Sequence, residues 1–470
     1  MTQVVIVGGG PGGYEAALVA AQIGGRVTLV DRDGVGGASV LTDCVPSKTL
    51  IATAELMSEI QSAGELGLRF GPRGEADSGT AVRVDLGAVN QRVLRLAQRQ
   101  SADIGERLRR EGVEIIAGTG RLDGPDRVLA TTVDGDQRVL EADVTLLATG
   151  AHPRVLSDAQ PDGERILNWT QLYELTELPE KLIVIGSGVT GAEFASAYDA
   201  LGADVVLVSS RDRVLPGEDA DAAKVLEGVF ERRGLQVMAR SRAAAVARDG
   251  DQVRVRLTDG REITGSHCLL AVGSVPNTDD LGLDSAGVQT DDRGFITVDK
   301  VSRTTARGVY AAGDCTGVLM LASVAAMQGR IAMWHSLGDA VAPLDLGAVS
   351  SNVFTAPEIA TVGVTQQQVD AGESTAVSVM LPLRGNPRAK MQGIREGFVK
   401  LFCLPVTGII VGGVVVAPKA SELIFPISIA VAQRITVDQL AQDFTVYPSV
   451  SGSISETARR MHGHDQLLRA

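Results

Sequence analysis

The pattern that most constrains this chain is a strand, a glycine-rich turn, a helix and a second strand in succession near the N-terminus. An apolar run over residues 4–7 leads into Gly8, Gly10 and Gly13, a helical pattern follows, and the next apolar run ends at Asp31. The first glycine permits a tight turn, the second lets the backbone approach a pyrophosphate, and the third allows the helix to pack closely on the strand. A carboxylate at the strand end can accept hydrogen bonds from ribose hydroxyls. The segment therefore predicts a dinucleotide-binding unit.

The same layout occurs a second time along the chain. It begins at an apolar run over residues 182–185, and its turn glycines are Gly186, Gly188 and Gly191, the first of them 178 residues after Gly8. Two copies at this separation favour two dinucleotide-binding domains over one large sheet.

The second copy ends in different residues from the first. Its final strand is followed by Ser209, Ser210 and Arg211, and Ser209 occupies the position at which NAD-preferring sites carry an acid. A carboxylate there would repel a 2′-phosphate, whereas hydroxyls and a guanidinium would bind one. The sequence therefore favours NADPH, with NADH still possible. The alternative for Arg211 is an ordinary solvated surface arginine.

Length and composition are those of a globular protein with several domains. The chain has 470 residues, 44% of them hydrophobic and 21% charged, which at roughly 150 residues per domain predicts about three domains. A net charge of −13 gives no global support for a nucleic-acid partner. No apolar run reaches the roughly 18 residues of a transmembrane helix, and Met1 leads into a strand without a signal peptide. We therefore expect a cytoplasmic protein.

The remaining periodic segments predict a third domain. A long amphipathic helix is expected over residues 88–111, and a polar loop over residues 71–79. Beyond residue 345 the runs are strand-like at 398–402 and 409–416 and helical at 422–433 and 437–443. Because this region has no glycine-rich phosphate turn, it is expected to form an α+β domain.

The cysteines are too widely spaced for a local redox or metal motif. Cys44, Cys268, Cys315 and Cys403 are at least 47 residues apart, so there is no CxxC motif, no zinc knuckle and no disulfide framework. No metal site is expected. Cys268 and Cys403 lie in apolar runs and are expected in the core, and Cys315 is expected to be a packing residue.

Five segments carry a resemblance to a known family. They span residues 36–48, 148–150, 271–277, 311–314 and 354–363. In order along the whole chain, they resemble the class I pyridine nucleotide-disulfide oxidoreductases, which include dihydrolipoamide dehydrogenase, glutathione reductase and mercuric reductase. The resemblance implies an α/β fold with two Rossmann-like domains, an α+β dimerisation domain and a homodimer. The implied domains are an FAD domain in two pieces (1–152 and 276–345), an NAD(P) domain (153–275) and a dimerisation domain (346–470).

The resemblance also implies which residues form the sites. In the family, the lysine at the position of Lys48 pairs with the glutamate at the position of Glu193 beside the flavin N5. A fixed cation there favours negative charge that develops on the reduced ring system. The positions implied to contact FAD are Gly8, Gly10, Gly13, Asp31, Gly37, Ala38, Lys48, Gly120, Asp314 and Ala322. Those assigned to the NAD(P) site are Gly186, Gly188, Gly191, Glu193 and Gly273, together with Ser209, Ser210 and Arg211.

The chain departs from the family at the dithiol relay, the two cysteines, the histidine and the glutamate that carry out disulfide chemistry in the family. The family segment carries two cysteines five positions apart, but here Ser39 takes the first position and only Cys44 remains. The family's histidine and glutamate, supplied across the dimer, are replaced by Tyr447 and Gly452. Serine cannot form a disulfide, and a tyrosine with an ordinary pKa near 10 is a poor proton shuttle at neutral pH. Disulfide reduction by the family route is therefore excluded.

Two interpretations of Cys44 stay open. Residues 45–48 have the pattern of a helix start, which would lower the pKa of the Cys44 thiol, while Asp43 would raise that pKa. In the functional interpretation, Cys44 alone cycles through a sulfenate or a mixed disulfide. In the alternative, Cys44 only fills space against the flavin.

The predicted activity follows from two observations. Both dinucleotide-binding segments are complete, and the residues of the dithiol relay are replaced except for Cys44. A planar two-electron acceptor such as a quinone would take electrons directly from the flavin, and the whole chain resembles lipoamide-dehydrogenase-like NAD(P)H:quinone reductases of actinobacteria. We therefore predict an FAD-dependent NAD(P)H dehydrogenase (quinone) that transfers hydride from NAD(P)H to FAD and then two electrons to a quinone. Lys48 and Glu193 would orient the nicotinamide and the flavin, and Tyr447 would help to place the acceptor. The alternatives are a peroxide or low-molecular-weight disulfide reductase that uses Cys44 alone, and a non-catalytic flavoprotein that binds partners.

Overall fold

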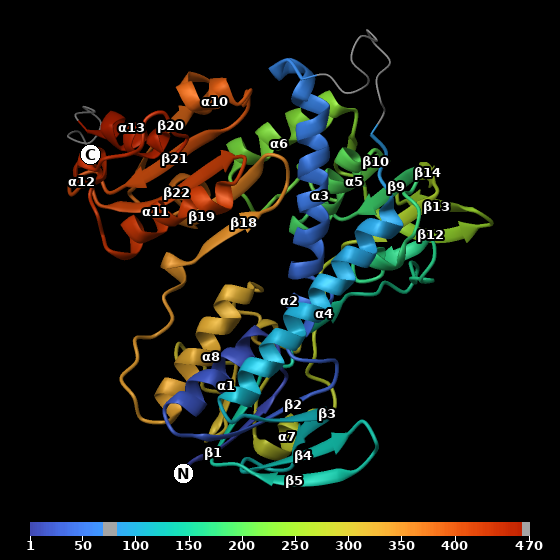
Figure 1. The fold of residues 1–470 in the computed structure, drawn as a ribbon, viewed down its shortest axis with the longest axis vertical. Helices are drawn as coiled ribbons and strands as arrows, with labels where there is room; N and C mark the ends of the chain where they lie inside the picture. The colour runs from blue at the N-terminus through green and yellow to red at the C-terminus, as the bar shows by residue number, and fades with distance from the viewer. Residues whose placement is uncertain (69–81, 463–470) are drawn as a thin grey trace.

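The chain folds around three main sheets, which Figure 1 shows at the bottom, at the right and at the upper left. The computed structural model describes residues 1–68 and 82–462. The predicted polar loop at 71–79 lies outside the described residues. Of the two long helices, α3 (Cys44–Ser62) stands between the two upper sheet regions, and α4 (Leu86–Arg110) crosses from the lower region toward the one at the right.

The first sheet has seven strands in the order β17-β6-β1-β2-β3-β4-β5. The first five strands in this order pair in parallel, and β4 and β5 continue from β3 as an antiparallel extension. Val4–Val7 are buried, as expected for a central parallel strand covered on both faces. Because β17 comes from a late segment, the first sheet is discontinuous in sequence. The strands are β1 (Gln3–Val7), β2 (Arg26–Asp31), β3 (Glu114–Leu122), β4 (Arg127–Thr132), β5 (Gln137–Glu141), β6 (Val144–Leu147) and β17 (Val309–Ala311).

Two helices cover this sheet and pack against each other. They are α1 (Pro11–Gln22) and α8 (Ala322–Ser336). A Cβ atom on Gly329 of α8 would lie 2.0 Å from the carbonyl oxygen of Gly12 in α1, so the close approach of the two helices requires a glycine at position 329. The late segment is therefore packed on the N-terminal nucleotide unit.

The second sheet repeats this arrangement with five parallel strands in the order β11-β10-β9-β15-β8. Its helices are α5 (Val189–Leu201) and α6 (Ala220–Arg233). In both of these sheets the strand before the glycine turn is central, and its two neighbouring strands lie on opposite sides of it. The strand order therefore reverses at this strand, and dinucleotides bind at such a topological switch point. The strands are β8 (Ile166–Asn168), β9 (Lys181–Ile185), β10 (Asp204–Val208), β11 (Gln236–Met238) and β15 (His267–Leu270), with a separate antiparallel sheet of β12 (Ala243–Asp249), β13 (Gln252–Leu257) and β14 (Glu262–Gly265).

The chain passes between the first two sheets through a two-stranded ribbon. The strands β7 (Ala151–Pro153) and β16 (Ser274–Pro276) pair antiparallel. Asn277 fastens the ribbon, because its Nδ2 donates to the Thr149 carbonyl at 2.8 Å and Thr149 Oγ1 donates to the Asn277 carbonyl at 2.7 Å. The ribbon lies at the predicted boundaries near residues 152 and 275, and the division into domains stays a prediction.

The third sheet is antiparallel, with the order β18-β19-β22-β21-β20. The two predicted strands (β21 and β22) and two predicted helices (α11 and α12) are confirmed with small shifts at their ends, whereas the other elements of this region were not predicted. The strands are β18 (Ser350–Val353), β19 (Glu358–Gly363), β20 (Val377–Pro382), β21 (Phe398–Cys403) and β22 (Ile410–Ala417), and the helices are α9 (Gln366–Asp370), α10 (Pro387–Met391), α11 (Ala420–Ala432), α12 (Val437–Gln442) and α13 (Gly452–Met461).

Other expectations about single elements are also confirmed. The amphipathic helix expected at 88–111 is α4, which begins after Asp85, whose side chain accepts a hydrogen bond from the Ala88 amide. Cys268, Cys315 and Cys403 are all fully buried. Among residues 1–68 and 82–462, no helix combines the length and apolar character needed to cross a bilayer.

Candidate active site

The first glycine turn is closed toward the protein and open toward solvent. Gly8 has φ +102°, and a Cβ atom there would lie 2.2 Å from the Ala148 carbonyl oxygen. A Cβ atom on Gly13 would lie 1.8 Å from the Gly8 oxygen, whereas one on Gly10 would meet nothing within 4 Å. Gly10 is also the N-cap of α1, where no side chain caps the helix. The turn can therefore present free backbone amides to a pyrophosphate.

Asp31 is the acid at the end of β2. Its carboxylate accepts hydrogen bonds from the amides of Gly9 at 2.6 Å, Gly34 at 2.6 Å and Asp33 at 3.0 Å. Burial raises the pKa of Asp31, and the three amide donors partly offset that rise. The carboxylate is therefore fixed beside the turn by backbone contacts.

Further residues assigned to FAD adjoin the same turn. Gly37 begins α2 (Gly37–Leu41), and a Cβ atom on it would lie 2.7 Å from the Gly10 Cα. A Cβ atom on Gly120 of β3 would lie 3.1 Å from Val7, at the end of β1. Ala38, next to Gly37, is exposed. This part of the assigned set therefore gathers near the carboxyl ends of β1 and β2.

The late segment contributes the other two assigned residues. Asp314 begins the short helix η3 (Asp314–Thr316), three residues after β17, and Ala322 begins α8. Burial raises the pKa of Asp314 to about 6, and the charge of Asp43 adds to the rise. The Asp43 carboxyl of the N-terminal segment is thus within electrostatic range of Asp314.

The second glycine turn has nearly the same geometry as the first. Gly186 has φ +111°, and a Cβ atom on it would lie 2.1 Å from the Ala271 carbonyl oxygen. A Cβ atom on Gly191 would lie 1.8 Å from the Gly186 oxygen, and one on Gly188 or Gly273 would meet nothing within 4 Å. Gly188 is the N-cap of α5. This turn also presents an open surface to a phosphate group.

The structure revises the interpretation of Ser209. Its side chain is fully buried, its hydroxyl lies 2.7 Å from the Ser187 hydroxyl, and it accepts a hydrogen bond from the Arg211 amide at 3.1 Å. This hydroxyl is therefore used inside the protein rather than presented to a 2′-phosphate. Ser210 and Arg211 are exposed at the end of β10.

Lys48 and Glu193 form the ion pair that the resemblance implies. Lys48 Nζ of α3 lies 2.8 Å from Glu193 Oε2 of α5, and the Glu193 side chain is only 4% exposed. The second oxygen of Glu193 accepts a hydrogen bond from the Phe354 amide at 2.9 Å, and Lys48 Nζ lies 4.8 Å from the centre of the Phe354 ring. Burial lowers the pKa of Lys48, but Glu193 outweighs burial and the pKa lies above its usual value. This pair joins segments of all three sheet regions.

The acidity of Cys44 depends on the two opposing effects that the sequence predicts, and on burial. Cys44 is the first residue of α3, as expected, and its thiol is free. The helix start was expected to lower the pKa of Cys44 and Asp43 to raise it; burial, which the sequence did not reveal, and the adjacent Asp43 raise that pKa to about 12. Ser39, at the position of the missing cysteine, donates a hydrogen bond to the Gly36 carbonyl at 3.0 Å. Cys44 is therefore a protonated thiol at neutral pH.

Tyr447 is not brought to the other candidates within one chain. Its side chain is 82% exposed, in the segment between α12 and α13. Gly452 is the first residue of α13. Tyr447 thus lies at the surface of the third sheet region, and Gly452 is partly buried at the start of the next helix.

Three residues near this pair were missed as site candidates. Asp43 is within electrostatic range of Lys48 and Glu193, and Tyr173 lies near Asp43, Glu193 and Cys44. The third is Phe354. The signal for Asp43 was present, since it is a charged residue directly before Cys44. Tyr173 gave no signal in the sequence, because only the fold brings its segment to α3.

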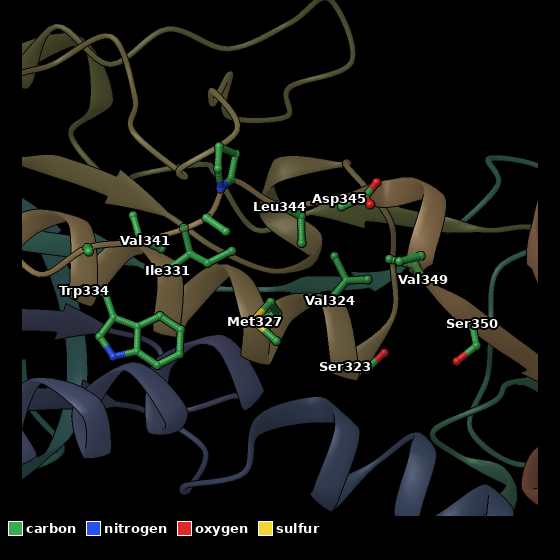
Figure 2. Close-up of a pocket in the computed structure, with 14 residues that line it drawn as sticks. Ser323, Val324, Met327, Ile331, Trp334, Val341, Leu344, Asp345, Val349 and Ser350 are labelled. Carbon is green, nitrogen blue, oxygen red and sulfur yellow. The ribbon is translucent and has the colours of Figure 1, made fainter. Parts of the chain in front are cut away.

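An apolar groove follows one face of α8. It has a volume of about 560 Å³, and Figure 2 shows the side chains that line it. Its end at Ser323 adjoins Ala322, so apolar surface lies next to one of the residues assigned to FAD. The main apolar lining residues are Val324, Met327, Ile331, Trp334, Val341 and Leu344.

Two dinucleotide turns with a partly buried lysine–glutamate pair between them define a class of protein, the flavin- and nicotinamide-dependent oxidoreductases. The pyridine nucleotide-disulphide oxidoreductase family model matches residues 2–329, and the dimerisation domain of the same family matches residues 349–458. The chain belongs to this family. Within the described residues, no group of three or more histidine, cysteine, aspartate or glutamate side chains could hold a metal ion.

Comparisons with individual proteins place the chain within this family. A protein of Mycobacterium tuberculosis strain H37Rv named NAD(P)H dehydrogenase (quinone) is 56% identical, covering 99% of this chain and 95% of the relative. The crystal structure of LpdA from Mycobacterium tuberculosis superposes with a TM-score of 0.93 at 55% identity, covering 98% of this chain and 100% of the other. A dihydrolipoyl dehydrogenase of Zymomonas mobilis is 33% identical, covering 98% of both chains.

Proposed function

We propose that this protein is an NAD(P)H dehydrogenase that uses FAD to reduce a quinone without a dithiol relay. The observation that carries the proposal is that Cys44 has no second cysteine to pair with, because Ser39 stands at the position of the missing one, in a chain whose two nucleotide turns are intact. The 56% identical relative named NAD(P)H dehydrogenase (quinone) supports the choice of acceptor.

The residues present fit FAD and a nicotinamide nucleotide, the cofactors that this family uses. The open face at Gly10 and the fixed Asp31 carboxylate suit the pyrophosphate and ribose of FAD, and the open face at Gly188 suits the second pyrophosphate. When bound, FAD supplies the ability to accept a hydride from the nicotinamide and to pass two electrons to an acceptor. Asp314 and Ala322 would complete the FAD site from the late segment.

Lys48 and Glu193 would orient the nicotinamide and the flavin where the three sheet regions meet. The 2.8 Å ion pair fixes the ammonium, and Glu193 is itself held by the Phe354 amide. A preorganised cation stabilises negative charge without reorganisation at the moment of reaction. The pair would therefore favour reduction of the group bound beside it.

For the nucleotide, we propose a preference for NADPH. The support is the absence of a carboxylate at position 209 and the exposed guanidinium of Arg211 at the end of β10. An arginine can pair with a 2′-phosphate through charge-assisted hydrogen bonds. Ser210 is exposed beside it and can add a hydrogen bond.

We also propose that the protein works as a homodimer. The dimerisation-domain match over residues 349–458 supports a second copy as partner. Large apolar side chains are exposed in this region, with Phe425 65% exposed on α11 and Phe444 fully exposed after α12. In a dimer that covers this surface, Tyr447 would lie at the site of the partner and help to place the acceptor.

Steady-state turnover tests this proposal. With NADPH as donor, the FAD-loaded protein should reduce menadione at a rate equal to or above its rate with oxygen, and lipoamide should give no turnover above background. A quinone rate no higher than background would contradict the proposal. A flavin that stayed oxidised on mixing with NADPH would instead support the non-catalytic alternative.

A further inference from the structure

A lysine is buried where the third sheet region meets the second. Lys400 lies in β21, and its side chain is 3% exposed. Its Nζ atom lies 2.8 Å from Asp219 Oδ2, 3.1 Å from Asp219 Oδ1 and 2.6 Å from Asp221 Oδ2. The Asp219 side chain is also 3% exposed, whereas that of Asp221 is 52% exposed. These contacts join β21 to the start of α6, two elements that are far apart in the sequence.

The ammonium of Lys400 is embedded in an apolar contact between the two regions. Side chains alternate along a strand, so Phe398, Lys400 and Phe402 lie on the same face of the third sheet. Phe398 and Phe402 belong to one hydrophobic core with Val214 and Leu215 of the second region. Buried ion pairs often stabilise a fold no better than apolar residues do. Stability therefore gives no reason for a lysine at this position, whereas a fixed geometry between the two regions does.

Asp219 transmits the contact with Lys400 to the backbone of the second region. Asp219 is the N-cap of α6, and its Oδ1 accepts hydrogen bonds from the amides of Asp221 at 2.9 Å and Ala222 at 3.2 Å. One carboxylate thus binds Lys400 and fixes the first turn of α6. Lys400 is therefore anchored to the far end of segment 209–219, which connects β10 to α6.

The near end of segment 209–219 is tied to the second glycine turn. Ser187 is the residue between the first two glycines of that turn, and its hydroxyl lies 2.7 Å from the Ser209 hydroxyl. The Leu215 amide donates to the Ser187 carbonyl at 2.8 Å. Leu215 is 1% exposed and has φ +50°, a rare conformation for a leucine, so its surroundings hold it in place. The segment therefore runs between two anchors, the glycine turn and Lys400.

The backbone of Arg211 is fixed within this segment while its side chain is exposed. The Arg211 amide donates to Ser209 Oγ at 3.1 Å, and the Arg211 carbonyl accepts from the Arg240 amide at 2.7 Å. Arg213 Nη2 donates to the Glu218 carbonyl at 3.1 Å, which bonds the middle of the segment to its end. The position of the segment therefore determines where the Arg211 guanidinium can reach.

We propose that Lys400 is a positioning residue for the nicotinamide nucleotide site. Through Asp219 it holds segment 209–219 against the second glycine turn, and so places the Arg211 guanidinium where a 2′-phosphate binds. Charge-assisted hydrogen bonds to a phosphate depend on the donor geometry, so a displaced segment weakens binding of NADPH but not of NADH, which lacks this phosphate. The inference rests on the proposed preference for NADPH.

Equilibrium binding of NADP⁺ and NAD⁺ to the FAD-loaded protein tests the proposal without turnover. Lys400→Met removes the cation and keeps an unbranched side chain on this apolar face. By calorimetry we expect the Kd for NADP⁺ to rise about tenfold, the scale of one hydrogen bond to a charged group, and the Kd for NAD⁺ to be unchanged. In steady state the KM for NADPH should rise by the same factor, with kcat unchanged.

Glu396→Gln is the matched control. Glu396 Oε1 lies 2.6 Å from Arg232 Nη2 of α6, so this pair also joins the second and third regions, but both side chains are exposed. Because exposed ion pairs contribute little, its loss should leave both Kd values unchanged. Arg211→Ala provides a second comparison. Since Lys400 acts through Arg211, adding Lys400→Met to Arg211→Ala should raise the Kd for NADP⁺ no further.

Amide hydrogen exchange measures the position of the segment directly. In Lys400→Met the amides of residues 209–219 should exchange faster than in the wild type, because one anchor is lost, and those of residues 8–13 in the first turn should not change. Asp219→Asn breaks the same contact from the other side and keeps an oxygen that can cap α6. It should give the same pattern, so the test does not depend on the folding of one variant.

The outcomes separate this inference from the proposed function. An unchanged Kd for NADP⁺ in Lys400→Met, equal rises for NADP⁺ and NAD⁺, or a further rise in the double variant would overturn the role of Lys400. An Arg211→Ala variant that binds NADP⁺ as tightly as the wild type would instead overturn the proposed preference for NADPH, on which the role of Lys400 depends.

Discussion

The two glycine turns share a backbone but differ at the ends of their second strands. Gly8 and Gly186 have φ values of +102° and +111°, and each approaches a carbonyl oxygen across the sheet at a distance that only a glycine tolerates. In the first unit the amide of Gly9 donates to the Asp31 carboxylate. In the second the equivalent contact joins the hydroxyls of Ser187 and Ser209.

This difference shows where the selectivity of each site resides. The backbone geometry that holds a pyrophosphate is the same in both turns, so it cannot distinguish one dinucleotide from another. The strand end can, because a carboxylate favours an unmodified ribose and its absence permits a 2′-phosphate. The first turn therefore suits a dinucleotide with an unmodified ribose, such as FAD, and the proposed preference for NADPH depends on the strand end of the second.

The largest effects are expected from a matched pair of variants, one in each glycine turn. Gly13→Ala and Gly191→Ala each place a Cβ atom 1.8 Å from a backbone oxygen, so the turn must shift. We expect Gly13→Ala to lose FAD during purification, and Gly191→Ala to retain FAD but to be reduced by NADPH more than 100-fold more slowly. Absorbance at 450 nm and stopped-flow reduction measure the two outcomes.

A control for folding exists within the first turn. A Cβ atom on Gly10 meets nothing within 4 Å, so Gly10→Ala should keep the thermal stability of the wild type and weaken only FAD binding. If Gly191→Ala also lost FAD, the two turns would not serve separate nucleotides.

A smaller effect is expected at the strand ends. Asp31→Asn removes a charged acceptor of three amide hydrogen bonds, so FAD affinity should fall about 10- to 100-fold, or about 1.4–2.8 kcal/mol. Ser209→Ala removes only a hydroxyl contact with Ser187 and should change NADPH affinity less than threefold. Fluorescence titration of apoprotein with FAD checks the first value, and an effect of Ser209→Ala as large as that of Asp31→Asn would break the comparison.

The nucleotide preference should depend on Arg211. Arg211→Ala is expected to raise the KM for NADPH about tenfold and to leave the KM for NADH unchanged, because only NADPH carries the 2′-phosphate. Steady-state kinetics with both donors provide the measurement and its internal control. Equal changes for the two donors would mean that Arg211 is a solvated surface residue.

The smallest effect is expected at Cys44. Burial and Asp43 raise the pKa of this thiol to about 12, so the protonated form persists throughout the neutral range and thiolate forms only near that pH. We expect no rapidly reacting thiol in the native protein at pH 8 with a thiol-specific disulfide reagent. Cys44→Ser should change the quinone rate less than twofold, and a loss of activity in this variant would favour the single-cysteine alternative.

Sequence reasoning predicts the parts of this protein that depend on local chemistry. The roles of Gly8, Gly10 and Gly13 follow from their spacing, and the Lys48–Glu193 pair follows from the resemblance. The burial of Ser209 and the raised pKa of Cys44 could not be predicted, because both depend on residues that only the tertiary fold brings together. The same holds for Tyr173, whose segment reaches α3 through its contacts with α4.

In the proposed reaction electrons leave this protein without passing through a dithiol, and an anaerobic reductive titration measures whether a dithiol takes part. A family member with FAD and a redox disulfide takes up four electrons per subunit, whereas FAD alone takes up two. We expect two electrons per subunit to complete the reduction of the FAD-loaded protein, in the wild type and in Cys44→Ser alike. Uptake of four electrons per subunit by the wild type would contradict it.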